Sequence, residues 1–199
     1  MYIHQDILDS IDRYKQQGKF SEALKLVNSI LIKDPNNQEA LIQVADIEYR
    51  KGEISNAQKP IDYLLKIKGE TDPMSLYIKG VLEMEKNNRI VAKNYLQKAL
   101  ELSRGENHEI VRCYGLCEYR YGNREKGILM LENSFHLNSL DAEIIYNLVE
   151  IYLLENRYSK AKTMIKYYFT KQKKLLTFDK EIAFYDNKIN LFQAFLNTL

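Results

Sequence analysis

The sequence alternates between short turn segments and longer segments in which apolar residues recur at the period of an α-helix. Residues 18–37, GKFSEALKLVNSILIKDPNN, show the order within one unit: a glycine, an aromatic residue, an alanine, an apolar stripe and then Asp-Pro. Glycine and asparagine readily adopt the positive φ angle found where a helix ends. These two residue types hold the predicted turns, at Gly18, Gly52, Asn87, Gly122 and Asn156. The pattern predicts an all-α chain.

A small residue follows each of these turns and marks a repeat. The positions are Ala23, Ala57, Ala92, Gly127 and Ala161, with successive spacings of 34, 35, 35 and 34 residues. A small side chain at this place lets the second helix of a unit approach the first closely. One such unit cannot bury its apolar face alone, whereas stacked neighbours can. The period therefore predicts an array of helix–turn–helix repeats.

These positions resemble the tetratricopeptide repeat (TPR) family, whose unit of about 34 residues is a helix–turn–helix hairpin. The family has small residues, aromatic residues and a proline at fixed places, and each repeat of the chain matches some of them. The matching residues are Tyr14, Phe20, Ala23 and Pro35; Leu41, Ala45 and Ala57; Leu76, Gly80, Ala92 and Ala99; Gly115 and Gly127; and Tyr152, Tyr158 and Ala161. The resemblance implies a right-handed α-solenoid of about five TPR-like helix–turn–helix repeats with a C-terminal capping helix.

The resemblance also sets the expected boundaries. The repeat array covers residues 1–177, and the capping helix covers 178–199. Within the array, the repeats are expected at about 4–37, 38–72, 73–107, 108–141 and 142–175. Two Asp-Pro pairs mark helix ends. Asp34-Pro35 ends the second helix of repeat 1, and Asp72-Pro73 supplies the N-cap and first residue of the helix that opens repeat 3.

Pro60 departs from the pattern because it falls inside the second helix of repeat 2. A proline there removes an intrahelical hydrogen bond and costs about 3 kcal/mol if nothing compensates. Either this helix is kinked at Pro60, or it begins later than the repeat pattern indicates.

The segment after the repeats carries two sets of apolar residues. The first forms one helical face that suits packing on repeat 5; its members are Phe178, Ile182, Tyr185, Ile189, Phe192 and Leu196. The second lies about 100° round the same helix and consists of Phe184, Leu191, Phe195 and Leu199. Two interpretations of the second set stay open: deeper burial against repeat 5, or a surface for self-association, such as a homodimer.

Charge and motifs narrow the function classes. A net charge of +2, from 29 basic and 27 acidic residues, gives no global electrostatic footprint for nucleic acid or an anionic membrane. The basic stretch at 157–174 interleaves Lys with aromatic residues and could bind nucleic acid, but it also fits an amphipathic helix of repeat 5. No signal peptide and no membrane-spanning segment are evident, so we expect a cytoplasmic protein.

We expect neither an enzyme nor a cofactor. The sequence has no Gly-rich phosphate loop, nucleophile elbow or HExxH motif. His108, Cys113 and Cys117 come nearest to a metal cluster, but their spacing is not that of a zinc site. We therefore expect Cys113 and Cys117 to be structural thiols in a helix–helix interface.

In the family that the chain resembles, the first helices of successive repeats line a concave groove. Transferred position by position, this implies a partner-binding surface formed by Tyr49, Met74, Tyr77, Val81, Met84, Arg112, Leu116, Tyr119, Tyr146 and Leu153. Its N-terminal end is acidic, with Asp12, Glu39 and Asp46. Such a surface suits a peptide or amphipathic helix with apolar anchors and a basic flank. Alternatively, some of these residues pack between neighbouring first helices.

The resemblance therefore implies a protein–protein interaction adaptor or scaffold. Some family members grip a C-terminal carboxylate with Lys and Asn, but this chain has Leu8, Asp12 and Ile42 at such positions, which argues against that clamp. A dedicated secretion or assembly chaperone that holds one client segment is the alternative, and nucleic-acid binding is a third. The first two of these alternatives bind a protein or peptide partner.

Overall fold

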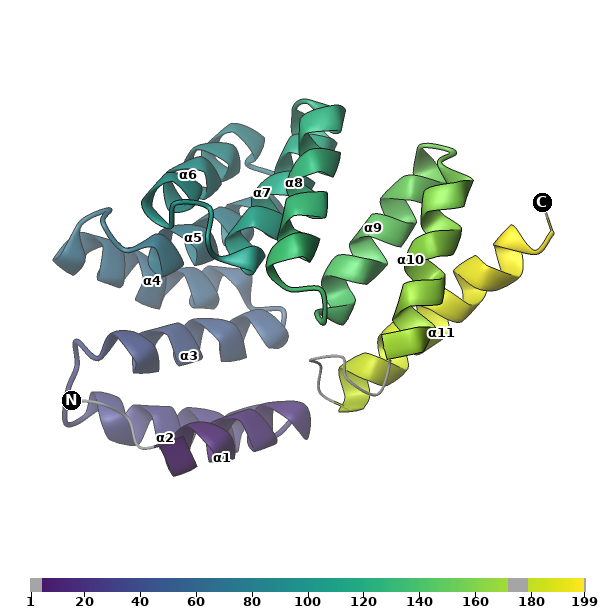
Figure 1. Cartoon of the computed structure of the whole chain (residues 1–199). Helices are drawn as coiled ribbons and strands as arrows, with labels where there is room; N and C mark the ends of the chain where they lie inside the picture. The colour runs from purple at the N-terminus through teal and green to yellow at the C-terminus, as the bar shows by residue number, and fades with distance from the viewer. Residues whose placement is uncertain (1–4, 172–178, 199) are drawn as a thin grey trace. The chain divides into compact units, whose positions relative to one another are not determined.

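The computed structural model describes residues 5–171 and 179–198, and all regular structure in these ranges is α-helical (Figure 1). Its helices are α1 (Gln5–Gln16), α2 (Phe20–Leu31), α3 (Gln38–Arg50), α4 (Ile54–Lys68), α5 (Pro73–Glu85), α6 (Arg89–Leu102), α7 (His108–Tyr121), α8 (Arg124–Leu137), α9 (Ala142–Leu154), α10 (Tyr158–Lys171) and α11 (Asp179–Leu196). The all-α prediction is confirmed.

The chain divides into two compact units, Met1–Leu102 and Ser103–Leu199, which are described separately below as unit 1 and unit 2. Unit 1 contains three helical hairpins, α1–α2, α3–α4 and α5–α6. The second helix of one hairpin also packs on the first helix of the next, as in α2 with α3 and α4 with α5. The small residues Ala23, Ala57 and Ala92 are completely buried, which is why the helices of each hairpin can pack closely.

Unit 2 contains the hairpins α7–α8 and α9–α10 followed by α11. One apolar core runs through α7 to α11 and includes Ile145, Leu148, Ile165 and Ile189, each at most 1% exposed. One close helix approach is at Gly127. A Cβ atom there would lie 2.5 Å from the backbone nitrogen of Tyr119, so α8 packs against α7 at a distance that only glycine permits.

Side-chain caps explain where several helices begin. Asn37, Asp72, Asn107, Asn123 and Asp141 each accept a hydrogen bond from a backbone N–H in the first turn of the helix that follows. The prediction that Asp72 and Pro73 start a helix is confirmed, because Asp72 is the N-cap of α5 and Pro73 its first residue.

Pro35 and Pro60 lie differently with respect to the helices: Pro35 follows the end of a helix, and Pro60 lies inside one. Helix α2 ends at Leu31, before the Asp34-Pro35 pair. Helix α4 begins at Ile54 and continues through the buried Pro60 to Lys68, so the alternative of a later start for this helix is wrong.

Candidate protein-interaction surfaces

Five residues predicted to bind a partner lie on the first helices of repeats 2 and 3 in unit 1. We call this set the apolar strip: Tyr49 on α3, and Met74, Tyr77, Val81 and Met84 on α5. The four α5 residues share one face because they are separated by three, four and three positions. Tyr49 is 37% exposed, and the four α5 side chains are half-buried. The strip therefore combines fixed side chains with accessible apolar surface.

The strip is held together across the two helices. The hydroxyl of Tyr49 donates a hydrogen bond to Oε1 of Glu85 at 3.3 Å, so the α3 ring is tied to the C-terminal end of α5. Met74 lies at the opposite end of α5, in its first turn. Tyrosine offers a large flat surface with a polar tip, and methionine adapts to irregular partners. This arrangement is chemically suited to binding apolar side chains and has no reactive group of its own.

The predicted acidic end is largely neutralised by basic residues. Lys15, whose side chain is 8% exposed, places its Nζ 2.7 Å from a carboxylate oxygen of Asp12 and 2.7 Å from one of Asp46. Arg50 Nε lies 3.0 Å from the same Asp46 carboxylate. Glu39 is exposed at the start of α3. Most of the negative charge expected to attract a basic flank is therefore already offset within unit 1.

The predicted residues of α7 offer little surface. Arg112 and Leu116 are each 8% exposed. The guanidinium of Arg112 lies 2.7 Å from Oε1 of Glu143 on α9, so this arginine joins two helices. These two residues fit the alternative in which predicted groove positions pack between neighbouring first helices.

Tyr119 and Leu153 are half-buried at the edge of the unit 2 core. The hydroxyl of Tyr119 donates to Oε1 of Glu155 at 2.7 Å. Burial, and then this carboxylate, raise the pKa of the Tyr119 phenol. The hydroxyl is therefore engaged within unit 2.

Tyr146 is covered by the C-terminal helix. Its ring stacks on Phe192 with a centroid distance of 5.8 Å and an interplanar angle of 18°, and it also contacts the rings of Tyr185 and Phe184. Its hydroxyl donates to Glu150 at 3.0 Å. Burial, together with the Glu150 charge, raises the pKa of Tyr146 to about 12. An element of the chain's own sequence thus occupies the surface where a partner was expected.

Helix α11 packs on both α9 and α10, and more extensively on α9 (Figure 1). Ile189 and Leu196 are buried in the core, and Tyr185 and Phe192 pack against it. The predicted packing face is confirmed for these four residues. Phe178 lies outside the described residues, and so does the side chain of Ile182.

The second apolar set of α11 points away from the core. Phe184 is 52% exposed, Leu191 is 65% exposed and Phe195 is 48% exposed, so the interpretation that they are deeply buried against repeat 5 is wrong. Leu199 lies outside the described residues. Self-association through this exposed face stays a prediction.

Sequence reasoning missed two clusters in which a tyrosine, a glutamate and a lysine meet. Glu132 of α8 accepts hydrogen bonds from Tyr152 at 2.6 Å and from Lys160 at 2.7 Å. Glu118 accepts from Tyr114 at 2.6 Å and from Lys126 at 2.8 Å. The first cluster joins α8 to α9 and α10, and the second joins the two helices of the α7–α8 hairpin. No motif in the sequence signals either cluster.

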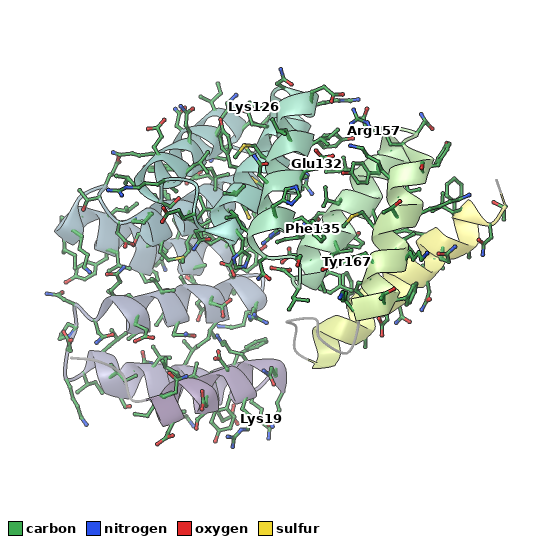
Figure 2. All side chains as sticks on the ribbon, in the orientation of Figure 1. Lys19, Lys126, Glu132, Phe135, Arg157 and Tyr167 are labelled. Carbon is green, nitrogen blue, oxygen red and sulfur yellow. The ribbon has the colours of Figure 1, made fainter. Side chains whose placement is uncertain are left out.

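Beside the Glu132 cluster, an aromatic contact also joins α8 to α10 (Figure 2). The ring of Phe135 on α8 meets that of Tyr167 on α10 edge to face, with centroids 5.1 Å apart. Glu132, one turn earlier on α8, lies on the same side of the helix. Aromatic and ionic contacts thus fix α10 against α8.

The described residues contain no group of three or more His, Cys, Asp or Glu able to hold a metal ion. Cys113 and Cys117 are both buried on α7, where structural thiols were expected. None of the described helices is long and apolar enough to cross a membrane.

Comparison with known proteins places this geometry in context. No family model matches the sequence. The chain is 23% identical over 150 residues to the BBSome complex member BBS4 homolog of Drosophila melanogaster, covering 74% of this chain and 30% of the relative. It is 24% identical over 159 residues to the TPR repeat-containing protein MJ1428 of Methanocaldococcus jannaschii, covering 79% and 28%. The chain thus spans less than a third of the length of these curated relatives.

Solved structures give the fold more directly. TTC0263, a thermophilic TPR protein of Thermus thermophilus, is similar with a TM-score of 0.73 at 19% identity, covering 93% of this chain and 98% of that one. YrrB, described as a TPR protein with an unusual peptide-binding site, is similar with a TM-score of 0.55 at 18% identity, covering 92% and 90%. These findings confirm the resemblance to the tetratricopeptide repeat family: the chain is a helical repeat protein with the TPR fold.

Proposed function

We propose that the chain is a protein-interaction adaptor or scaffold that binds a peptide or an amphipathic helix of a partner along the apolar strip of unit 1. The observation that carries the proposal is the strip itself, with two tyrosines and two methionines aligned on adjacent first helices and partly exposed. A preformed surface of this kind loses little conformational entropy when it binds.

The TPR fold supports a binding role in general, and the structure of YrrB offers a precedent because that protein has a peptide-binding site. The location in unit 1 follows from burial. Of the corresponding positions in unit 2, Arg112 and Leu116 are buried and Tyr146 is covered by α11, which leaves only Tyr119 and Leu153 half-buried at the edge of the core. The proposal needs no cofactor and no catalytic step.

The ligand that fits this strip has apolar anchors rather than a strongly basic flank. Lys15 and Arg50 already offset Asp12 and Asp46. We therefore expect affinity to depend mainly on apolar contacts and only weakly on salt.

A capture experiment from native lysate tests the proposal, with bound proteins identified by mass spectrometry. The test variant is Tyr49→Ala, and the matched control is Tyr63→Ala. Tyr63 lies in the same unit on α4, is 41% exposed against 37% for Tyr49, and also donates one hydrogen bond, to Asn36. Far-ultraviolet circular dichroism should show that both variants remain helical.

We expect partners to be lost with Tyr49→Ala and retained with Tyr63→Ala. Equal retention in both variants would reject the strip as the binding surface. A single stoichiometric client would favour the chaperone alternative, whereas several substoichiometric partners would favour an adaptor.

A further inference from the structure

Helix α10 differs from every other described helix in its charge. Its sequence, YSKAKTMIKYYFTK, contains four lysines and no aspartate or glutamate, whereas each of the other described helices contains at least one acidic residue. The lysines face different surroundings. Lys160 pairs with Glu132 of α8 at 2.7 Å, so its charge is offset within unit 2.

Lys162 and Lys166 have no such partner. Both are exposed, and neither has a carboxylate within ion-pair distance among residues 5–171 and 183–198, the part of the chain whose side chains are described. They lie four positions apart and so share one face of the helix. This face keeps two positive charges that nothing in the described structure neutralises.

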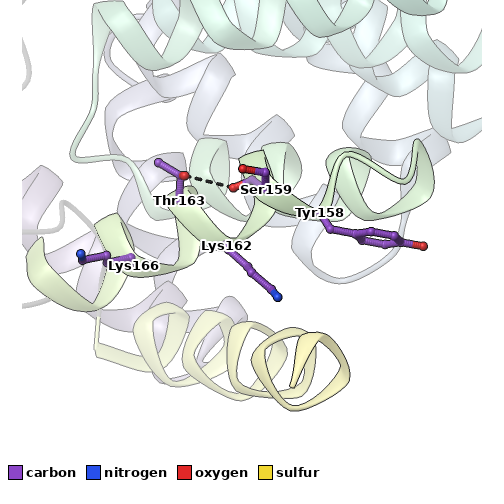
Figure 3. Close-up of a pocket in the computed structure, with 5 residues that line it drawn as sticks. All are labelled: Tyr158, Ser159, Lys162, Thr163 and Lys166. Atoms are coloured by element: carbon purple, nitrogen blue, oxygen red, sulfur yellow. Dashed lines mark hydrogen bonds between the residues drawn. The ribbon is translucent and has the colours of Figure 1, made fainter. Parts of the chain in front are cut away.

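The two lysines line a shallow depression of about 400 Å³ together with Tyr158, Ser159 and Thr163 (Figure 3). Figure 3 shows the Lys162 side chain extending from α10 toward the side on which α11 lies. Thr163 donates its hydroxyl hydrogen to the backbone oxygen of Ser159 at 3.0 Å, which leaves its oxygen lone pairs as acceptors. The Ser159 hydroxyl has no hydrogen-bond partner in the part of the chain that is described, so it can donate to an anion.

We propose that this face of α10 binds an acidic peptide segment of a partner protein, with Lys162 and Lys166 pairing with carboxylates and Ser159 donating a hydrogen bond. The spacing fits an extended peptide. Two lysines four positions apart on a helix are separated by about 6 Å along its axis, and alternate side chains of an extended strand are separated by about 7 Å. Glutamates at alternate positions can therefore meet both lysines.

The charge distribution favours a peptide over a nucleic acid. Binding of a nucleic-acid backbone requires a broad basic surface with aromatic rings free for stacking. Here Arg157 pairs with Glu125 and Lys160 with Glu132, so these two cations of the stretch are already used. The Tyr168 ring is buried in the core. Two exposed lysines beside a small depression match a short run of carboxylates.

The experiment measures binding of a fluorescein-labelled peptide of eight glutamates to the full chain, by fluorescence anisotropy at low salt. The test variant is Lys162→Gln/Lys166→Gln. The matched control is Lys59→Gln/Lys66→Gln, which removes the same charge from two exposed lysines of α4, a helix that also carries Asp62. Single-stranded poly(U) of similar charge serves as the competing probe.

We expect the test variant to weaken peptide binding about fivefold or more, while the control stays within twofold. Binding should also decrease as salt is added. The proposal is overturned if the wild-type chain does not bind the peptide, if both double variants weaken it equally, or if poly(U) binds more tightly with the same lysine dependence. Tyr49→Ala should leave peptide binding unchanged, which separates this surface from the apolar strip; a loss there would also overturn the proposal.

Discussion

Single small residues decide how closely the helices of each hairpin pack. At Gly80 an added Cβ would lie 2.6 Å from Cγ of the buried Leu96 and 3.2 Å from its backbone nitrogen, so the closest contact is with a side chain. At Gly127 it would lie 2.5 Å from the Tyr119 backbone nitrogen and 2.7 Å from the Gly115 carbonyl oxygen, both main-chain atoms. The sequence pattern places small residues at both sites, but only the structure shows which of them tolerates no change.

We therefore predict that Gly127→Ala destabilises the chain by about 3 kcal/mol or more, because α8 must move away from α7. Gly80→Ala should cost less, about 1–2 kcal/mol, because the nearest atoms belong to the Leu96 side chain and the nearest backbone atom is 3.2 Å away. Urea unfolding followed by circular dichroism measures both. Equal losses for the two variants would contradict the backbone contact at Gly127.

Buried phenols give the protein a dependence on alkaline pH. The pKa of Tyr146 is raised to about 12, first by burial and then by Glu150. Because the folded state holds this proton more tightly than the unfolded chain, its contribution to stability is complete below pH 10 and is lost as pH rises toward 12.

Tyr146→Phe should therefore flatten the decrease in unfolding free energy between pH 10 and 12. Tyr63→Phe is the control, because it removes a hydroxyl from a side chain that is 41% exposed. Denaturant unfolding at a series of pH values measures the slope, and an unchanged slope in Tyr146→Phe would show that its phenol titrates normally.

At the scale of the helices, the sequence predicts that α11 packs on repeat 5, but not which helix of that repeat it contacts more. Its apolar face identifies it as a packing helix, and Ile189 and Leu196 are indeed buried. Its more extensive contact with α9 than with α10 depends on tertiary contacts, such as the stacking of Tyr146 on Phe192, that no local pattern reveals. The predicted hairpins, by contrast, follow from a period that repeats along the sequence.

Tyr168 links α10 to α11 and gives a test of this docking. Its hydroxyl donates to the Asp186 carboxylate at 2.7 Å, and the phenol side chain is completely buried. Tyr168→Phe should reduce the free energy of unfolding by about 2 kcal/mol, as expected for a buried hydrogen bond to a charged group.

The matched control for this bond is Tyr158→Phe. The Tyr158 hydroxyl bonds to Asn156 in an exposed turn, so its loss should cost less than about 0.5 kcal/mol. Thermal unfolding of both variants distinguishes the two sites. Similar losses would indicate that the Asp186 bond does not hold α11 in place.

At the scale of the whole molecule, the repeat period predicted the fold. The residues predicted to bind a partner, however, differ in exposure between the two units. The apolar strip in unit 1 is partly exposed, whereas Tyr146 in unit 2 is covered by α11. Position in a repeat indicates the side of a helix on which a residue lies. It does not indicate whether a neighbouring helix covers that side, because this depends on segments distant in sequence.

The central claim is that partners bind the apolar strip, and hydroxyl-radical footprinting of the captured complex tests it most directly. Methionine and tyrosine side chains react in proportion to their exposure, so mass spectrometry can compare free and bound protein residue by residue. We predict slower oxidation of Tyr49, Met74 and Met84 in the complex and unchanged oxidation of Tyr63, which is exposed on α4 of the same unit. Unchanged rates at the three strip residues, with protection at Tyr63 instead, would contradict the account.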